Sequence, residues 1–397
     1  MTSPPDTAEA DFRASVRSEL SARLAPRPED RPVSVLGAGN DDLDAGRRYL
    51  EALAGSGLAT PAWPREYGGL GATPAEVAVI RRELADFDVP DLYPYLVGLE
   101  LIGPTLLAHG TAAQCARWLP PIATGAEIWC QLFSEPGAGS DLAGLATRAH
   151  AEGDAWRAHG QKVWTSRGAY SQYGLLLARH DPAVPKHQGI TAFGLDMRTP
   201  GVDVRPLRQM NGDAHFTEVF LDDALIPDTD RIGAAGEGWR VALTCLSFER
   251  GAATAGSSGG LLDVDRLIAL AQARGVASDP AVRDALARLV VDLRVMAMTI
   301  RRARDTARTG QPGPAGSGLK LRGSRTFRDY TNLALRILGA DALTAPEPWH
   351  TLFLTAPSLS IRGGTDEIQR NIVGERVLGL PEEPRLDRAL PFDQLPK

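Results

Sequence analysis

The sequence predicts a multidomain α+β protein that is mostly helical, with a helical first third, a β-rich middle and a final helix bundle. In the first and last thirds, apolar residues recur at steps of three and four, which is the period of an amphipathic helix. Between residues 126 and 235 the pattern changes to short runs of β-branched and aromatic residues separated by turn dipeptides. At 397 residues the chain is also too long for one ordinary core.

The first third contains five segments with helical periodicity. They cover residues 11–24, 44–58, 74–87, 92–110 and 112–125. Stretches rich in turn-forming residues, at 61–74 and 87–91, interrupt this pattern. We therefore expect an N-terminal helical domain over residues 1–125.

The middle third contains five runs typical of strands, at residues 155–166, 173–180, 189–197, 202–207 and 216–227. Several strands at this spacing predict a small β-sandwich or barrel, which we place at residues 126–236. Long helical runs then cover residues 239–255, 261–274, 280–308 and 319–338. They predict an antiparallel helix bundle over residues 237–397.

Composition and charge narrow the function classes. The net charge is −6 and the basic residues are dispersed, so we expect no nucleic-acid binding. The acidic opening and the lack of an apolar stretch near 20 residues predict a cytoplasmic protein without membrane insertion. Three well-separated cysteines, Cys115, Cys130 and Cys245, suggest reduced core residues, and no histidine or cysteine spacing predicts a metal site.

Three segments could carry chemistry. The loop from Gln131 to Ala149 contains Gly137 and Gly139 but lacks the strand and helix context of a dinucleotide site. Trp164 ends an expected strand and, taken alone, is predicted to be a core residue. Near the C-terminus, a glycine pair precedes Thr365, which can cap a helix, and acidic residues in the first turn suit the helix dipole. Such a start suits an anion or a close backbone approach, although a plain turn is equally consistent.

Taken together and in order, these segments resemble the acyl-CoA dehydrogenase family over nearly the whole chain. The resemblance is carried by Ser134 to Asp141, Gly160 to Ser166, Phe216 to Pro227, Leu246 to Gly251 and Gly363 to Asn371. It implies a helical domain, a β domain and a C-terminal four-helix bundle, usually assembled as tetramers with FAD at subunit contacts. It also implies FAD-dependent α,β-dehydrogenation of an acyl thioester.

The resemblance also implies roles for individual residues. The flavin ring would lie against Leu132, Phe133, Ser134, Trp164, Thr165 and Ser166, with Ser166 at the N5 edge and Ser134 at the pyrimidine side. Gly139 and Ser140 would belong to the cofactor site, and Ser140 would also lie near the pantetheine arm of the substrate. Thr365 and Glu367 match positions that contact the FAD of a neighbouring subunit. An Arg-x-Gln-Phe-Gly motif that many relatives use for FAD is missing, and Arg274 or Arg283 could replace its charge.

The catalytic base that the resemblance implies could occupy one of two positions in the chain. Many relatives place a glutamate immediately before the last Gly-Thr pair, where this chain has Gly363. Another branch of the family uses the glutamate of a Glu-Arg pair on the helix after the β domain, here Glu249 and Arg250. Apolar neighbours favour burial of Glu249, which would raise its pKa toward a useful value, and Gly363 leaves room opposite. A surface ion pair is the simpler alternative. The substrate contacts implied are Ser140, Arg250, Gly363 and Gly364.

The sequence is consistent with more than one substrate, electron acceptor and assembly. The thioester could be an acyl-CoA or an acyl-carrier-protein conjugate, with an electron-transfer flavoprotein as the electron acceptor. The assembly could be a homotetramer, a homodimer or a mixed tetramer in which this chain is a non-catalytic, FAD-holding partner. A flavin oxidase on the same fold is a further alternative. A hydrolase with Ser258 as nucleophile is disfavoured because Ser258 follows a helical run rather than a strand.

Overall fold

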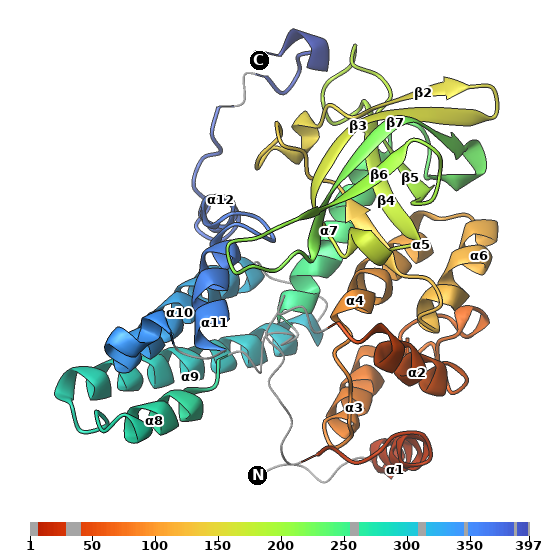
Figure 1. Ribbon diagram of the computed structural model, residues 1–397. Coiled ribbons are helices and arrows are strands. Elements are labelled where there is room, and N and C mark those ends of the chain that lie inside the picture. Colours follow the sequence, from red (N-terminus) through yellow and green to blue (C-terminus); the bar gives the residue numbers. More distant parts are fainter. Residues whose placement is uncertain are drawn as a thin grey trace.

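The computed structural model describes residues 7–28, 41–254, 262–308, 315–344, 348–384 and 387–395. The β region lies at the top right of Figure 1, with the N-terminal helices below it and most of the C-terminal helices at the lower left. The long helix α7 (Gly238–Thr254) runs from the β region toward the C-terminal helices. This arrangement is the three-part architecture that the sequence predicts. Ala255, at the end of a predicted helical run, and Ser258, which follows that run, lie outside the described residues.

The N-terminal region is helical, as expected. Its helices are α1 (Thr7–Ser21), α2 (Leu43–Ala54), α3 (Pro74–Leu84), α4 (Tyr93–Leu96), α5 (Gly103–His109) and α6 (Ala112–Ala123). Capping boxes begin two of them, from Thr73 to Glu76 at α3 and from Thr111 to Gln114 at α6. The segment expected as one helix over 92–110 is instead α4, a π-helical turn η2 (Val97–Ile102) and α5. This π turn packs against α7.

The β region is one sheet that curls around its own core. Its strands are β1 (Trp129–Leu132), β2 (Arg148–Glu152), β3 (Ala155–Ser166), β4 (Tyr173–Arg179), β5 (Ile190–Asp196), β6 (Val202–Leu207), β7 (Phe216–Pro227) and β8 (Arg231–Ile232). The order is β6-β7-β3-β2-β4-β5-β8, and β1 pairs in parallel with β4. Leu132, Trp156, Leu176, Phe193 and Leu221, from five different strands, share one buried cluster. The five predicted strands are confirmed, whereas β1, β2 and β8 are short and were not predicted.

The C-terminal region contains α7, α8 (Val264–Ala273), α9 (Pro280–Arg308), α10 (Ala315–Leu338), α11 (Trp349–Thr355) and α12 (Asp366–Arg376). Helix α10 is central, because it packs against α7, α8, α9, α11 and α12. Short 3-10 turns complete the fold at η1 (Arg65–Tyr67), η3 (Leu142–Gly144), η4 (Gly168–Tyr170), η5 (Asp228–Asp230), η6 (Gly339–Leu343), η7 (Ala356–Ser360) and η8 (Phe392–Gln394).

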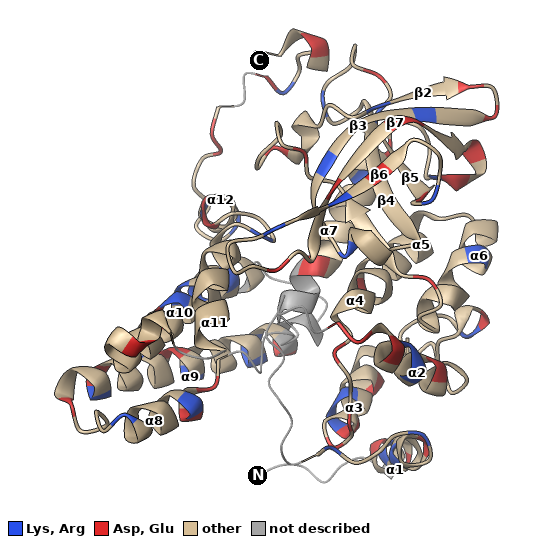
Figure 2. Cartoon of the chain, in the orientation of Figure 1, with Lys and Arg blue, Asp and Glu red and all other residues tan. Residues whose placement is uncertain are grey.

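Surface charge and cysteines follow the expectations from composition. Basic and acidic residues are interspersed along the helices and around the sheet (Figure 2). Cys115, Cys130 and Cys245 are free and buried, which confirms their prediction as reduced core residues. Within the described ranges, no helix is long and apolar enough to cross a membrane.

Candidate active site

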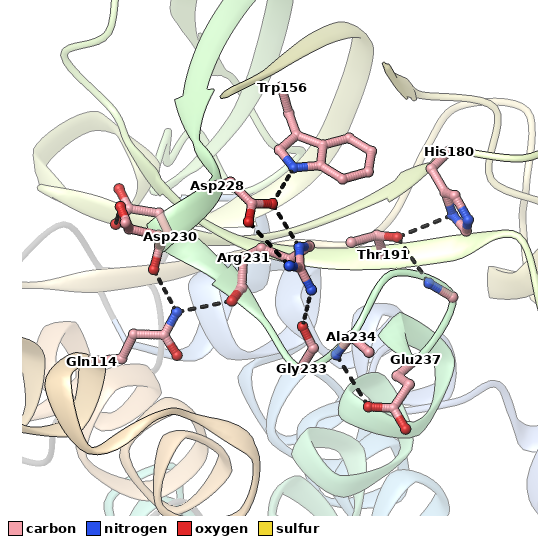
Figure 3. A network of polar contacts seen from close by, with 12 residues as sticks. Gln114, Trp156, His180, Thr191, Asp228, Asp230, Arg231, Gly233, Ala234 and Glu237 are labelled. Carbon is pink, nitrogen blue, oxygen red and sulfur yellow. Dashed lines mark hydrogen bonds and ion pairs between the residues drawn. The ribbon is translucent and has the colours of Figure 1, made fainter. Parts of the chain in front are cut away.

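A polar network fixes the point where the chain leaves the sheet and enters α7, the helix that carries Glu249 (Figure 3). The side chain of Gln114, on α6, is buried and donates from Nε2 to the carbonyl oxygens of Thr229, at 2.7 Å, and Arg231, at 2.8 Å. The Arg231 guanidinium donates to Asp228 at 2.8 Å, and Trp156 of β3 donates to the same carboxylate at 2.7 Å. The N-terminal helices and the sheet are thereby joined directly before α7.

The start of α7 rests on β5. The backbone N–H of Gly236 donates to Thr191 Oγ1 at 3.1 Å, and the Ala234 N–H donates to the Glu237 carboxylate at 3.1 Å (Figure 3). Gly238, the first residue of α7, packs so closely that a Cβ there would lie 2.6 Å from the carbonyl carbon of Thr191. Because nothing larger than glycine fits at this contact, the helix axis is fixed relative to the sheet.

Glu249 lies at the edge of a buried face of α7. Val241, Ala242 and Cys245 on this helix are completely buried, and Glu249 itself is half-buried. Leu246 and Phe248, two of the apolar neighbours noted in the sequence, pack against the same core. Burial raises the pKa of the Cys245 thiol to about 12, and the negative charge of Glu249 one turn away contributes to the rise. The carboxylate therefore lies close to the core rather than out in solvent.

The Glu249 carboxylate faces the glycine pair near the C-terminus. A Cβ built on Gly363 would lie 3.4 Å from Glu249 Oε1. This contact joins α7 to the turn before α12, two segments far apart in the sequence. From the sequence we expect room opposite Glu249 at Gly363, and the two residues do lie opposite each other.

The glycine pair has a conformational reason to exist. Gly363 and Gly364 have φ angles of +64° and +82°, in the left-handed region that residues with a Cβ rarely adopt. Thr365 then caps α12 by accepting a hydrogen bond from the Ile368 N–H at 3.3 Å, which confirms the predicted cap. The buried Gln369 donates back to the carbonyl oxygen of Gly363 at 3.0 Å. The turn is thus held from both sides of the glycine pair.

The two segments expected at the flavin ring lie side by side. The Val163 N–H donates to the carbonyl oxygen of Ser134 at 2.9 Å. A bulge in β3 between Lys162 and Thr165 accompanies a positive φ of 60° at Trp164, whose side chain is 56% exposed. The prediction of Trp164 as a core residue is therefore wrong, because the bulge turns the ring out of the sheet. Its ring packs edge-on against Phe216.

A buried ion pair between Lys162 and Glu135 connects β3 to the segment that contains Ser134. Lys162 is completely buried, and its Nζ lies 2.7 Å from Glu135 Oε1 and 3.3 Å from the carbonyl oxygen of Phe133. Burial lowers the pKa of Lys162 to about 8, although the Glu135 carboxylate acts against this change. Glu135 also accepts backbone N–H groups from Ala146, at 2.6 Å, and Thr147, at 3.0 Å. Sequence reasoning missed this pair, and a lysine inside an expected strand was the available signal.

The chemistry of these positions fits a flavin. Trp164 offers an exposed aromatic face, and Ser134 and Ser166 offer an exposed and a half-buried hydroxyl beside it. The buried Thr165 Oγ1 has no hydrogen-bond partner among the described residues, and the same holds for Oε1 of Gln369 beside the glycine turn. Buried polar atoms normally find partners, so both positions are suited to a polar ligand.

The remaining predicted site residues occupy varied positions. Gly139, at φ +54°, and Ser140 lie in an exposed loop, Thr365 is half-buried and Glu367 is exposed. Leu132 and Phe133 are buried. The side chain of Arg250 lies outside the described part of the chain. Arg274 pairs with Asp341 within the bundle, which weakens its case as an FAD contact, whereas Arg283 is exposed on α9.

Comparison with protein-family models shows which family the chain belongs to. The N-terminal, middle and C-terminal domains of acyl-CoA dehydrogenases match residues 6–126, 130–224 and 236–378 of this chain. The chain belongs to the acyl-CoA dehydrogenase family. Members of this family are FAD-dependent flavoproteins. The chain has the three-domain fold of the family.

Three relatives illustrate the similarity of this acyl-CoA dehydrogenase to known proteins. Acyl-CoA dehydrogenase IpdE1 of Mycobacterium tuberculosis is 40% identical, over 94% of this chain and 98% of its own length. The solved structure named Tcur3481-Tcur3483 steroid ACAD is 28% identical, with a TM-score of 0.78 over 96% of this chain and 100% of that one. The ChsE4-ChsE5 complex from Mycobacterium tuberculosis contains a chain 27% identical, with a TM-score of 0.73 over 96% of this chain and 100% of that one.

Proposed function

We propose that this acyl-CoA dehydrogenase forms an α,β double bond in an acyl thioester, with Glu249 as the base that removes the α proton. The observation that carries the proposal is the position of Glu249 Oε1, 3.4 Å from where a Gly363 side chain would begin. Many relatives carry the catalytic glutamate at the position of Gly363. In this chain the carboxylate of Glu249, on α7, would act at the same place. A positioned base contributes typically about 10²–10⁴-fold to such a proton transfer.

The other predicted site residues would bind the cofactor and the thioester. Bound FAD would supply the chemistry of hydride acceptance from the β carbon. Ser134, Trp164 and Ser166, with Leu132, Phe133 and Thr165, would hold and orient the ring, and hydroxyl or N–H donors near it would favour an anionic reduced form. Gly139 and Ser140 would contact cofactor and pantetheine, and Thr365 and Glu367 would contact FAD of a second subunit. Arg250, Gly363 and Gly364 would line the thioester site.

An anaerobic titration tests the proposal. Bleaching of the flavin absorbance would be followed while acyl-CoAs of increasing length, branched acyl-CoAs and a steroid side-chain acyl-CoA are added. The last is included because a relative is named as a steroid enzyme. Wild type should bleach with at least one thioester, Glu249→Gln should bind FAD but stay yellow, and the exposed Glu66→Gln should behave as wild type. Normal bleaching by Glu249→Gln would show that another group is the base.

Two alternatives concern the partners of this chain. The names of two solved relatives each contain two components, which supports a mixed assembly in which the present chain needs a second, similar subunit. Copurification of such a subunit, with FAD retained only in its presence, would favour that assembly over a homotetramer or homodimer. An electron-transfer flavoprotein is the proposed electron acceptor, and release of peroxide under air would indicate an oxidase instead. An acyl-carrier-protein thioester belongs in the same titration.

A further inference from the structure

We propose that the C-terminal segment Asp387–Leu395 forms part of the thioester-binding apparatus, because it fixes the glycine-rich loop through Lys186. The glycine-rich loop is defined here as residues 135–144, and it contains Ser140. The inference rests on the proposed function, which places Ser140 beside the pantetheine arm. It assigns a positioning role to Lys186 and to a segment that the rest of the reaction does not use.

The tip of the glycine-rich loop has little support of its own. A Cβ on Gly137 or Gly139 would meet nothing within 4 Å, and Ser140 is exposed. Inside the loop, the Ala138 N–H donates to the carbonyl oxygen of Glu135 at 3.3 Å, and the Asp141 N–H donates to the carbonyl oxygen of Ala138 at 3.0 Å. Ala138 is half-buried, whereas the other residues of the tip are exposed. A tip held mainly by turn hydrogen bonds is easily displaced, so contacts from outside must hold it.

One end of the loop is fixed by the buried pair of Glu135 and Lys162, and the other end is fixed by Arg179 of β4. Arg179 is buried and donates to the carbonyl oxygens of Ala143, at 2.6 Å, and Leu145, at 3.1 Å. It also donates to the carbonyl oxygen of Lys186 at 3.0 Å. Arg179 therefore ties the end of the loop to the segment that carries Lys186.

Between these ends, Lys186 holds the loop next to Ser140. Its Nζ lies 2.8 Å from Asp141 Oδ2 and 2.7 Å from Asp387 Oδ2, and its side chain is 12% exposed. Burial acts to lower the pKa of Lys186, but hydrogen bonds to the two carboxylates outweigh it and the pKa is raised. One ammonium group thus joins the loop to the C-terminal segment.

The C-terminal segment is docked by more than this ion pair. The Phe392 ring lies under the guanidinium of Arg179, 3.5 Å from its central carbon. The N–H groups of Phe392 and Asp393 donate to the carbonyl oxygens of Val184 and Pro182, both at 3.0 Å. Figure 1 shows this last part of the chain beside the β region, well away from the bundle. Both cations that hold the loop, Arg179 and Lys186, therefore also contact the C-terminal segment.

The proposal has a direct physical consequence. With Asp387 in place, the largely buried Lys186 is held between two partly exposed carboxylates, Asp141 at 52% and Asp387 at 39% exposure. Without it, the pair of Lys186 and Asp141 becomes an ordinary surface ion pair, of a kind that contributes little because water and salt screen it. The loop tip should then open more often, and a thioester that needs Ser140 in place should bind more weakly.

Hydrogen exchange on the full-length, FAD-loaded protein tests the loop directly. Amides 137–141 should exchange about fivefold faster in Asp387→Asn and in Lys186→Gln, which corresponds to the roughly 1 kcal/mol that an ion pair contributes. Lys186→Arg should restore slow exchange, since arginine keeps the charge. Arg205→Gln removes an exposed ion pair with Asp203 on β6, away from the loop, and should leave these amides unchanged. Unchanged exchange in both Asp387→Asn and Lys186→Gln would overturn the proposal.

Binding of coenzyme A gives a second readout. In the same two variants, the Kd for coenzyme A should rise about fivefold, in line with the loop opening. KM for the thioester should rise similarly while kcat changes much less, because the base on α7 is untouched. An unchanged Kd alongside faster exchange would overturn the role in binding. If wild type bleaches with a thioester but binds no coenzyme A, the role of the segment in binding is overturned. If wild type bleaches with no thioester at all, the proposed function fails, whereas the exchange result still stands or falls by itself.

Discussion

Replacing Gly363 by alanine tests the link between the C-terminal turn and the base on α7. The new Cβ would lie 3.4 Å from Glu249 Oε1, an ordinary van der Waals contact, so the carboxylate could stay where it is but could not move closer to the turn. If the reaction requires the carboxylate about 1 Å closer to the turn, this limit costs up to about 10²-fold in rate, or about 2.7 kcal/mol. The left-handed backbone at Gly363 adds a folding cost of about 1 kcal/mol, because alanine disfavours that conformation.

Gly339→Ala is a matched control for the backbone cost. Gly339 also has a left-handed φ, of +62°, but a Cβ there would meet nothing within 4 Å. Both variants should lose similar thermal stability, and only Gly363→Ala should lose about 10²-fold in the rate of anaerobic flavin bleaching by acyl-CoA. Stopped-flow absorbance and thermal unfolding measure the two effects separately. Wild-type bleaching by a folded, FAD-loaded Gly363→Ala protein would refute the idea that Glu249 works across from this glycine.

Two further predictions concern the scaffold beneath the site. Lys162→Met should lower the free energy of unfolding by about 3–5 kcal/mol because it leaves the Glu135 carboxylate buried without its cation. Adding Glu135→Gln should recover part of that loss in a urea titration, and no recovery would contradict the pairing. Asp228 has its pKa lowered from 3.8 to about 2 by hydrogen bonds from Arg231 and Trp156. Its carboxylate therefore stabilises the fold above pH 4 and loses that effect as the pH falls through 2. Asp228→Asn should be about 1 kcal/mol less stable than wild type at neutral pH, a modest value because the side chain is 44% exposed, and this gap should close in acid.

Local sequence features predicted most of the secondary structure correctly. The bounds of β3, β6 and β7 agree with the runs identified in the sequence, because alternating β-branched and aromatic residues between turn residues restrict a strand within a few positions. Thr365 was predicted as a cap because hydroxyl side chains at that position satisfy free N–H groups whatever the rest of the fold does. By contrast, β1 and β2 hold only four or five residues, too few for a period to show.

Features of the candidate site that depend on long-range contacts were less predictable. Trp164 was expected in the core, since large aromatic residues usually are, yet a bulge in its strand exposes the ring. The buried Lys162 and Glu135 pair could not be found from spacing, because its partners come from separate segments and meet only when the sheet forms. The docking of Phe392 on Arg179 is of the same kind.

The sequence by itself determined the three regions, the helix caps, the positions of the glycines and, through its motifs, the resemblance to a family. These properties follow from neighbours within a few residues, where backbone preference and periodicity act. The resemblance already implied that Glu249 lies opposite Gly363, and the tertiary structure supplied the distance between them. Only the tertiary structure decided that the C-terminal segment reaches Lys186. Such contacts join residues far apart in the chain, so they are fixed by how α7, the sheet and the C-terminal helices pack, and packing depends on all three regions at once.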